Sequence, residues 1–384
     1  MTALRRIVIV GNGIAGVTAA DTLRAAGYDG DLTLVGDEPH PAYSRPALSK
    51  ALLRSDPDDT AHLLPPPGHG AVELTGVRAT GLDVDGRQVQ LDDGRRLDFD
   101  GLVIATGCRP RRLRDATGDG QEPIELVLRT IEDAMLLRER MAQHPSVVVV
   151  GGGPLGMEVA SACREIGCPV TLVSHGPPLL HQLGAHLSSV FVAAALDHGL
   201  VVRQGRAVSV DGDTESALVR LADGSELEAH VVVTAIGDVP NDEWLASSGL
   251  LREGRLVVDE AGRVRPDIVA CGDVAVVRTP RGEQRVPLWS AAIDQSRVAA
   301  ASLIGEHVEP ADARPYFWTE QFGLSLKAVG HLPFASEPTL VDGDPREGRQ
   351  LLHWAAATID DQAAASINYR IPIPKLRRLG VPAS

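Results

Sequence analysis

Aromatic side chains, cysteines and long apolar runs are all scarce in this sequence of 384 residues. No apolar run reaches the ~18 residues needed to span a membrane. A strand pattern begins almost at the first residue, which predicts that no signal peptide is present. The few cysteines show no metal-ligand spacing, so we expect no metal site and a reducing, cytoplasmic location. They are Cys108, Cys163, Cys168 and Cys271.

Positive charge is also in short supply. The chain has 37 Lys and Arg against 51 Asp and Glu, for a formal net charge of −14 at pH 7. Nucleic acids bind to concentrated basic faces, so this balance argues against a nucleic-acid partner. The charge favours solubility but carries no information about the fold. The length predicts two or three domains, each with an ample core.

The first stretch with a clear pattern is RRIVIVGNGIAG, an apolar run followed by three glycines. The run Ile7–Val10 is β-branched, as expected of a buried parallel strand. Gly11 permits a tight turn, Gly13 lets a pyrophosphate approach the backbone, and Gly16 lets a helix pack closely on the strand. This arrangement is typical of a dinucleotide-binding turn.

A helix and a second strand complete this first unit. Ile14 and Ala15, which are candidate cofactor-binding residues, open the helix. The helix stops near Gly27, and Leu32–Val35 forms the next strand. Asp37 follows roughly 20 residues after the motif, where a carboxylate accepts hydrogen bonds from an adenosine ribose. The ordered set of strand, glycines, helix, strand and acid predicts a dinucleotide site. The alternative is a glycine-rich turn in an unrelated α/β domain.

The same pattern recurs later in the chain, at SVVVVGGGPLGMEVASACREIG. A predicted strand, Val147–Val150, leads into Gly151, Gly153 and Gly156, which open a second helix. A second strand follows at Val170–Val173. The recurrence predicts a second dinucleotide site.

A further pair of segments supports a duplication. DDGRRLDFDGLVIATG ends at Thr106 and Gly107, and LADGSELEAHVVVTAIG ends at Gly237. Each reads as a hairpin followed by a buried strand and a glycine, and Thr106, Gly107 and Gly237 are candidate cofactor-binding residues. Two dinucleotide sites in one chain indicate electron transfer between two dinucleotides, for which a flavin and a nicotinamide are the usual pair.

Four further segments identify a family: AYSRPALSK, LRTIEDA, IVACGDVA and FWTEQFG. With them the sequence resembles, over nearly its whole length, the FAD-dependent NAD(P)H ferredoxin reductases that serve oxygenases, which are relatives of apoptosis-inducing factor. The glycine motifs are shared by many flavoproteins, whereas RPALSK and FWTEQFG are far more specific to this family.

The resemblance implies a fold and a domain order. The fold class is α/β, with two nested Rossmann-like dinucleotide-binding domains, as in glutathione reductase, and a C-terminal α+β domain. The implied FAD-binding domain is split between residues 1–112 and 238–312. The NAD(P)H-binding domain would occupy 113–237, and the third domain 313–384.

The resemblance also implies an activity. Hydride would pass from NAD(P)H to FAD, and single electrons would pass on to a 2Fe–2S ferredoxin that supplies an oxygenase. Related disulfide reductases place cysteines after the first glycine motif, but AYSRPALSK contains none, so no dithiol relay is expected. Cys163 and Cys168 are read as small buried hydrophobes. Rubredoxin reductase, another NADH-dependent reductase, or a flavin-bound redox-sensing or interaction protein are the alternatives.

In this family a lysine lies near the flavin ring with a glutamate as its neighbour, and Lys50 and Glu158 match them. Two solvated surface charges are the alternative interpretation. Asp273 matches a carboxylate that holds a ribitol hydroxyl of FAD, but a helix N-cap aspartate would look the same in sequence.

The remaining positions matched to the flavin site are arginines, a small residue and tryptophans. Arg45 and Arg129 match family arginines near the FAD phosphates, where a guanidinium binds bidentately. Ala79 would meet the adenine through its backbone. Trp289 and Trp318 match positions at the flavin, Trp318 with a role in gating access. Surface arginines and core tryptophans are the alternatives.

One departure from the family concerns the nicotinamide nucleotide. Where an acid usually receives the NADH ribose, this chain has Ser174 and His175. The missing acid removes repulsion against the 2′-phosphate of NADPH, yet no arginine follows to bind it. On family grounds NADH is favoured. His175 is either an NADPH contact or a solvated turn residue.

Ferredoxins are usually acidic, so docking on an acidic protein calls for a local basic patch. CRPRRLR and PKLRRLG are the candidate patches, and ordinary solvated basic runs are the alternative. The residues concerned are Arg109, Arg111, Arg112 and Arg114 in the first run, and Lys375, Arg377 and Arg378 in the second.

Overall fold

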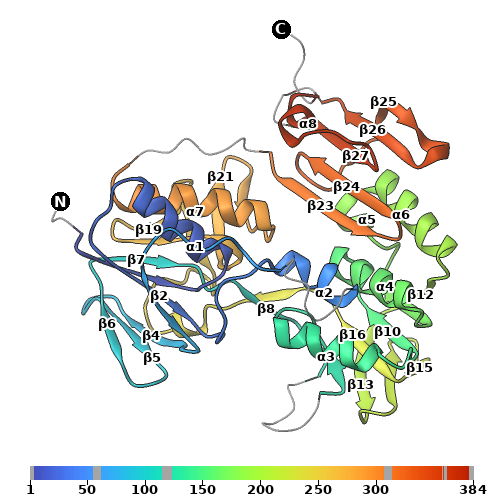
Figure 1. Ribbon diagram of the computed structural model, residues 1–384, viewed down its shortest axis with the longest axis horizontal. Coiled ribbons are helices and arrows are strands. Elements are labelled where there is room, and N and C mark those ends of the chain that lie inside the picture. The colour runs from blue at the N-terminus through green and yellow to red at the C-terminus, as the bar shows by residue number, and fades with distance from the viewer. Residues whose placement is uncertain are drawn as a thin grey trace. The chain divides into compact units, whose positions relative to one another are not determined.

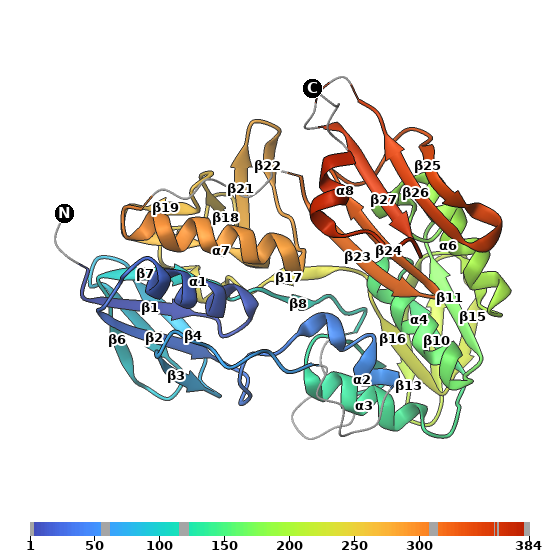
Figure 2. The ribbon, with the colours of Figure 1, turned by 45° about the horizontal axis from the view of Figure 1, so that its top comes forward.

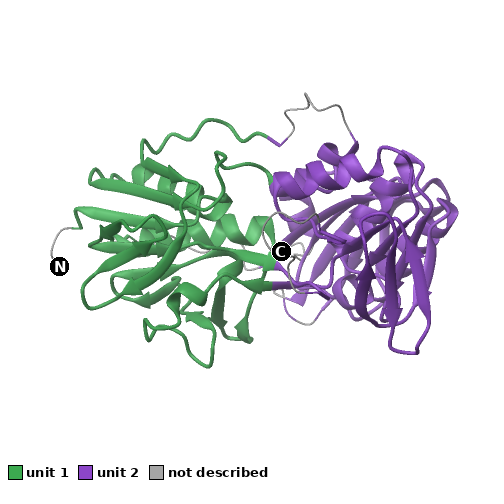
Figure 3. Cartoon of the chain, turned by 90° about the horizontal axis from the view of Figure 1, so that it is seen from below, with its two compact units in different colours: residues 1–44, 63–109, 239–313 green, residues 45–62, 110–238, 314–384 purple. Residues whose placement is uncertain are grey.

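The computed structural model describes residues 4–54, 62–114, 123–306, 314–356, 358 and 361–379. These form two compact units, each assembled from separate segments of the chain (Figure 3). Unit 1 comprises residues 1–44, 63–109 and 239–313, and unit 2 comprises residues 45–62, 110–238 and 314–384. Two paired strands, β8 (Cys108–Pro110) and β17 (Asp238–Pro240), carry the chain out of unit 1 and back into it.

Unit 1 is built on a six-stranded sheet with the order β19-β20-β7-β1-β2-β3. The central strand β1 pairs in parallel with β2 and β7, and the positions after its first are buried, as its β-branched sequence predicts. The strands are β1 (Arg6–Val10), β2 (Asp31–Gly36), β3 (Val72–Thr75), β7 (Gly101–Ile104), β19 (Arg263–Arg265) and β20 (Ile268–Ala270).

Different layers cover the two faces of this sheet. Helices α1 (Ile14–Ala25) and α7 (Trp289–Leu303) lie side by side on one face, where small alanines let them approach the strands closely (Figure 1). The hairpins of β4 (Ala79–Asp83), β5 (Gln88–Leu91) and β6 (Arg96–Asp98) cover the other face and share a core with β7. A small three-stranded sheet completes unit 1: β18 (Leu256–Val258), β21 (Ala275–Thr279) and β22 (Gly282–Gln284).

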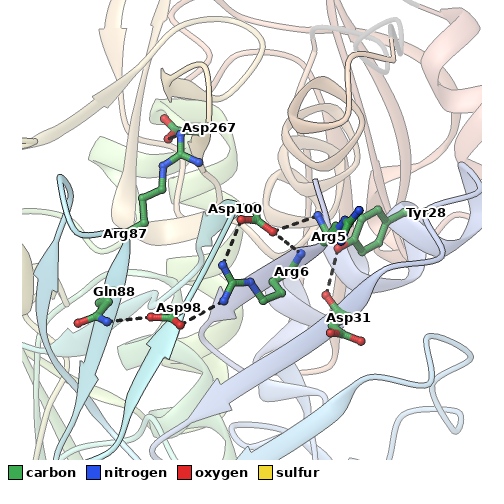
Figure 4. A network of polar contacts seen from close by, with 9 residues as sticks. All are labelled: Arg5, Arg6, Tyr28, Asp31, Arg87, Gln88, Asp98, Asp100 and Asp267. Atoms are coloured by element: carbon green, nitrogen blue, oxygen red, sulfur yellow. Dashed lines mark hydrogen bonds and ion pairs between the residues drawn. The ribbon is translucent and has the colours of Figure 1, made fainter. Parts of the chain in front are cut away.

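A polar network ties the beginning of β1 to the strands around it (Figure 4). Asp100, just before β7, accepts hydrogen bonds from the backbone N–H groups of Arg5 and Arg6 at 3.1 and 2.9 Å. Arg6 also pairs with Asp98 at 3.1 Å. The side-chain hydrogen bond from Arg6 lowers the pKa of Asp100 below its usual value. The network lies at the amino end of β1 and leaves the carboxyl end to the glycine turn.

Because the pKa of Asp100 is lowered in the folded state, its contribution to stability is present above the unfolded pKa of about 3.9 and is lost as the pH falls through the folded pKa. We therefore expect the free energy of unfolding to fall less in Asp100→Asn than in the wild type when the pH is lowered from 6 to 3, roughly the range in which carboxylates titrate. Urea denaturation at each pH measures this. Equal losses in the two proteins would show that the Asp100 network does not set the acid response.

Unit 2 repeats this design around a second sheet, in which all strands are parallel, with the order β12-β11-β10-β16-β9. Its strands are β9 (Glu125–Leu126), β10 (Val147–Val150), β11 (Val170–Ser174), β12 (Val201–Gln204) and β16 (Val231–Thr234). Helix α4 (Pro154–Ile166) follows β10, and a three-stranded meander shares a core with the valines of the sheet. The meander consists of β13 (Ala207–Gly212), β14 (Ala217–Leu221) and β15 (Glu226–Ala229).

The rest of unit 2 contains an antiparallel sheet with the order β23-β24-β27-β26-β25, and helix α8 (Ile373–Leu379) packs on it (Figure 2). The strands are β23 (Tyr316–Gln321), β24 (Leu324–Val329), β25 (Thr339–Asp344), β26 (Arg349–Trp354) and β27 (Ala363–Ile367). The other helices are α2 (Ala51–Arg54), α3 (Ile131–Met141), α5 (Leu180–Leu183) and α6 (Ala185–Asp197). Among the described helices, none combines the length and apolar character of a membrane span.

The parallel strands at the centre of the two sheets confirm the predicted duplication. In each, the strand before the glycine motif pairs on one side with the strand after the first helix, and on the other with the strand that follows the hairpin. The fold class is α/β with two Rossmann-like sheets and a further antiparallel sheet, as predicted. The assignment of three ligand-specific domains stays a prediction.

Candidate functional site

The first glycine turn has the backbone shape that the sequence predicts. Gly11 has φ of +120°, and a Cβ there would lie 2.1 Å from the carbonyl oxygen of Ala105. A Cβ on Gly16 would lie 1.8 Å from the carbonyl oxygen of Gly11. At Gly13, by contrast, a Cβ would meet nothing within 4 Å. Gly11 and Gly16 are therefore required by the fold, whereas Gly13 leaves open space beside the backbone.

The start of helix α1 lies at this open space. Gly13 is its N-cap and supplies no side-chain hydrogen bond, so the first helical N–H groups remain available to an anion. Ile14 and Ala15 are the first helical residues. The neighbouring Asn12 donates to Glu73 at 2.9 Å, while its buried Oδ1 has no partner among the described residues. The uncapped helix start, with its free N–H donors, fits the diphosphate of a dinucleotide.

The second glycine turn has the same geometry. Gly151 has φ of +119°, with the Cβ position 2.2 Å from the carbonyl oxygen of Ala235. Gly156 would meet the carbonyl oxygen of Gly151 at 1.9 Å. Gly153 caps α4 without a side-chain hydrogen bond, and the Cβ position there meets only the end of Gln182, at 3.8 Å. The second turn therefore fits a second diphosphate.

Polar groups at the strand ends beside each turn were predicted only in part. In unit 1 the Thr106 hydroxyl donates to the carbonyl of Asn241 at 2.7 Å, and the Asn241 side chain donates to the carbonyl of Thr106 at 3.0 Å. Gly107, with φ of +67°, accepts from the backbone of Asn241. In unit 2 the buried Thr234 hydroxyl has no partner among the described residues, and Gly237 has φ of +104°.

Sequence reasoning did not select Asn241 or Thr234. The only signal for Asn241 was the segment GDVPN directly after the second hairpin strand. Asp37 and Ala79 were predicted, and the structure places Asp37 at the carboxyl end of β2, whereas Ala79 belongs to the separate sheet of β4, β5 and β6. Asp37 is exposed just after β2 and pairs with Arg78 at 3.6 Å, and Ala79 is buried as the first residue of β4.

Asp273 lies in a different local structure from the one expected. It belongs to a 3₁₀ turn, Gly272–Val274, that leads into strand β21, so no long helix begins here. The helix N-cap interpretation is therefore wrong, because the residue at the cap position is Cys271 and makes no side-chain cap. The Cys108 thiol contacts Asp273 Oδ2 at 3.4 Å, and Arg285 Nε donates to its backbone carbonyl at 2.6 Å.

The structure brings Lys50 and Glu158 together in unit 2. Lys50 Nζ lies 2.8 Å from Glu158 Oε2, and the two side chains are 14% and 8% exposed. The interpretation as solvated surface charges is therefore wrong. Lys50 is presented by the turn after the 3₁₀ helix Arg45–Ala47, and Glu158 by the first turns of α4.

Two hydroxyl groups complete the surroundings of the Glu158 carboxylate. Ser49 donates to Oε2, and Thr319 on β23 donates to Oε1 at 2.6 Å. Gln321 in turn donates to the Thr319 hydroxyl at 2.9 Å. A carboxylate this buried is stable only with charge-assisted hydrogen bonds, and here a lysine and two hydroxyls supply them. Ser49 and Thr319 were missed, although both lie inside the specific motifs RPALSK and FWTEQFG.

The predicted arginines also meet. Arg45 Nη1 donates to the backbone carbonyl of Arg129 at 2.7 Å. Arg129 precedes α3, where Thr130 and Asp133 form a capping box, and the Asp133 carboxylate also accepts from the Arg129 N–H at 2.8 Å. Burial raises the pKa of Asp133. Arg129 is therefore fixed by the helix start and is not a surface helix arginine; its role toward phosphate stays a prediction.

The two predicted tryptophans occupy half-buried positions. Trp318 neighbours Thr319 on β23, but successive side chains on a strand point to opposite faces. The Trp318 ring accordingly stacks on Tyr316, with centroids 5.7 Å apart. Trp289 is the first residue of α7. Their contacts with a flavin stay predictions.

None of the four cysteines, all of which lie in the described part of the chain, forms a disulfide, and all four are buried. Cys163 lies in α4 and Cys168 just after it, and burial raises the pKa of both thiols. Burial also raises the pKa of Cys271 to about 11. These thiols are placed as packing groups, in agreement with the sequence-based interpretation. No group of potential metal ligands occurs among the described residues.

We expect the native protein to react slowly with a thiol reagent such as DTNB at pH 8, since burial blocks access to all four thiols and a raised pKa keeps Cys163, Cys168 and Cys271 protonated. All four should react promptly once the chain is unfolded in guanidinium. A count of released chromophore checks this. Rapid reaction of two thiols in the folded protein would instead indicate an accessible dithiol.

The two basic runs differ in which of their side chains form hydrogen bonds or ion pairs with other residues. In the first, Arg109 pairs with Glu243, and Arg112 donates to the backbone carbonyl of Glu125 at 2.8 Å. Arg111 is exposed and has no side-chain partner among the described residues. Arg114 is exposed, and its backbone N–H donates to Glu125. In the second run, Lys375 and Arg378 are exposed, while Arg377 contacts the backbone of Arg314 at 3.2 Å.

Comparison with known proteins agrees with this geometry. Residues 5–296 match the model of the pyridine nucleotide-disulphide oxidoreductase family. The chain belongs to this family. It is an oxidoreductase that uses FAD and a nicotinamide dinucleotide.

Individual relatives extend over most of the chain. The ferredoxin–NAD(+) reductase component of the p-cumate 2,3-dioxygenase system of Pseudomonas putida is 36% identical, and the match covers 89% of this chain and 84% of the relative. Rhodocoxin reductase of Rhodococcus erythropolis is 38% identical, with 84% and 78% covered. The covalent putidaredoxin reductase–putidaredoxin complex is a structural neighbour with a TM-score of 0.86 and 30% identity, covering 99% of this chain and 93% of that chain.

Proposed function

We propose that this protein is an NADH-dependent ferredoxin reductase that supplies electrons to an oxygenase through a 2Fe–2S ferredoxin. The observation that carries the proposal is the presence of two uncapped glycine turns of the same geometry in one chain. The names of its relatives support the choice of acceptor. Its buried cysteines, which form no disulfide, fit a reducing compartment, and we propose the cytoplasm.

We assign FAD to the first turn and the nicotinamide nucleotide to the second. The N–H groups at the start of α1 would bind the FAD diphosphate, and those at the start of α4 would bind the diphosphate of NADH. FAD, when bound, supplies the step from two-electron to one-electron transfer. Glu158, with its two hydroxyl donors, holds the ammonium of Lys50 in a fixed position.

The test is anaerobic stopped-flow reduction of the FAD-loaded protein, followed at the flavin absorbance. NADH should bleach the flavin rapidly, and a 2Fe–2S ferredoxin added next should restore the oxidised spectrum. Bleaching without reoxidation would reject that ferredoxin as the acceptor. If neither NADH nor NADPH bleached the flavin, the reductase proposal would be wrong.

Ferredoxin docking is proposed to use Arg111, the exposed arginine of the first basic run. Arg111→Glu should raise the apparent Michaelis constant for an acidic ferredoxin roughly fivefold at low salt, because a rim charge acts mainly on association. Steady-state ferredoxin reduction at several ionic strengths measures this, and the difference should shrink as salt is added. Arg252→Glu changes the net charge equally at an exposed arginine outside both runs, and should have no effect. Equal effects of the two variants would place docking elsewhere.

A further inference from the structure

The carboxyl end of β11 is where the second dinucleotide fold differs most from the first. Both motif strands pair with their neighbours in the same register, so Ser174 is equivalent to Gly36 and His175 is equivalent to Asp37. The first repeat therefore places a carboxylate just after its strand, and the second places an imidazole there. His175 is exposed, and Ser174 is buried.

The segment that contains β11 and the residues after it is free of acidic residues. The chain has no Asp or Glu from position 166 to position 196. The Ser174 side chain packs directly over the glycine turn, since a Cβ on Gly152 would lie 2.2 Å from Ser174 Oγ. In folds of this type an acid at this place binds the 2′-hydroxyl of the adenosine ribose, and a cation there accommodates a 2′-phosphate. Ser174 and His175 carry no carboxylate, so the acid that would repel a 2′-phosphate at this place is missing.

A cation follows the neighbouring strand. The parallel ladder between β11 and β12 is extended by a hydrogen bond of 2.9 Å from the Gly205 N–H to the Ser174 carbonyl, and Arg206 is the next residue. Arg206 is exposed, and within the described part of the chain its side chain has no hydrogen bond or ion pair. Arg203, on the same strand, is by contrast held by Asp223 at 3.1 Å.

The core residues next to Ser174 and Arg206 show where these two residues lie relative to the core under the meander. Val173 and Ala207 both pack into the core beneath the meander of β13, β14 and β15. Successive side chains in extended chain point to opposite faces. Ser174, the residue after Val173 on β11, therefore points away from that core, and Arg206, the residue before Ala207, is exposed. The strand ends thus bring a serine, an exposed imidazole and an unengaged guanidinium to one edge of the sheet.

We propose that His175 and Arg206 form a subsite for the 2′-phosphate of a phosphorylated adenine dinucleotide, so that the second fold accepts NADPH as well as NADH. The inference rests on the proposed function, in which this fold binds the nicotinamide nucleotide. A guanidinium is well suited to the role, since it binds phosphate oxygens bidentately and is always charged.

The test measures binding rather than turnover. The FAD-loaded full-length protein is titrated calorimetrically with ADP-ribose and with 2′-phospho-ADP-ribose, which lack the nicotinamide. The wild type should bind the phosphorylated fragment at least as tightly as the other. Arg206→Gln should weaken only the phosphorylated fragment, by about tenfold, the usual worth of a hydrogen bond to a charged group. His175→Asn should act in the same direction.

Arg203→Gln is the matched control, because it removes an arginine three positions away that is already paired. It should leave both affinities unchanged. If the wild type bound ADP-ribose but bound 2′-phospho-ADP-ribose more than tenfold more weakly, the subsite would be wrong, and the proposed function would still stand. Equal losses for both fragments in Arg206→Gln would also overturn it. Binding of neither fragment to the wild type would overturn the nucleotide assignment itself and the subsite with it.

Discussion

Gly13→Ala is expected to yield a folded protein that has lost its FAD. The Cβ position at Gly13 meets no atom within 4 Å, so the added methyl group costs the polypeptide little. The same open space is where the diphosphate would approach the backbone, and a methyl group there would hold it away from the start of α1. Purified Gly13→Ala should have a wild-type far-UV circular dichroism spectrum and almost no flavin absorbance.

Gly16→Ala is the matched control, with the same chemical change three residues away. Its Cβ would lie 1.8 Å from the carbonyl oxygen of Gly11, so strand and helix must separate. We expect it to destabilise the apoprotein by roughly 1–3 kcal/mol, the usual cost of overpacking. Denaturation of flavin-free protein separates the two effects. If Gly13→Ala retained a full complement of FAD, the first turn would not be its diphosphate site.

Lys50→Met is expected to destabilise the fold by roughly 3–5 kcal/mol, since removing one member of a buried ion pair leaves the other without compensation. The partner left behind is Glu158, 8% exposed and enclosed by the hydroxyls of Ser49 and Thr319. Those two donors satisfy its oxygens but cannot balance its charge. The free energy of unfolding in urea is the quantity to measure.

The double variant Lys50→Met/Glu158→Gln distinguishes a lost ion pair from a packing defect. Glutamine keeps the shape of Glu158 and can still accept a hydrogen bond, so the double variant should be more stable than the sum of the single losses predicts, by roughly 1–3 kcal/mol. Lys327→Met is the control, because this lysine lies on β24 and takes part in no described ion pair. Strictly additive losses would show that Lys50 and Glu158 do not stabilise one another.

Much of the fold could be read from the sequence because the signals were local. The β-branched runs and glycine triplets specify a strand, a turn and a helix within about 25 residues, and the structure has them in both repeats. The local structure at Asp273 was predicted wrongly because the local signal there is ambiguous. A glycine-aspartate pair after a strand is compatible with a helix start or with a 3₁₀ turn, and only the following strand β21 decides between them.

The parts of the site that escaped prediction depend on pairings between distant segments. Thr319 reaches Glu158 across 161 positions, and Thr106 reaches Asn241 across 135. A serine or threonine hydroxyl has no spacing rule that marks it as the donor to a particular carboxylate. The lysine and glutamate were found because a family motif linked them, whereas their hydroxyl neighbours became visible only with the strand β23 in place.

The packing of α1 against α7 has a consequence for synthesis on the ribosome. The alanine face of α1 is complete by Ala25, but α7, which covers part of that face, begins only at Trp289. At a synthesis rate of about 5–20 residues per second, on the order of 10–60 seconds would pass between the synthesis of α1 and that of α7. During that interval the alanine face of α1 is exposed on the nascent chain, while residues 110–238 are synthesised. Slow translation or a shortage of chaperones should therefore harm unit 1 first.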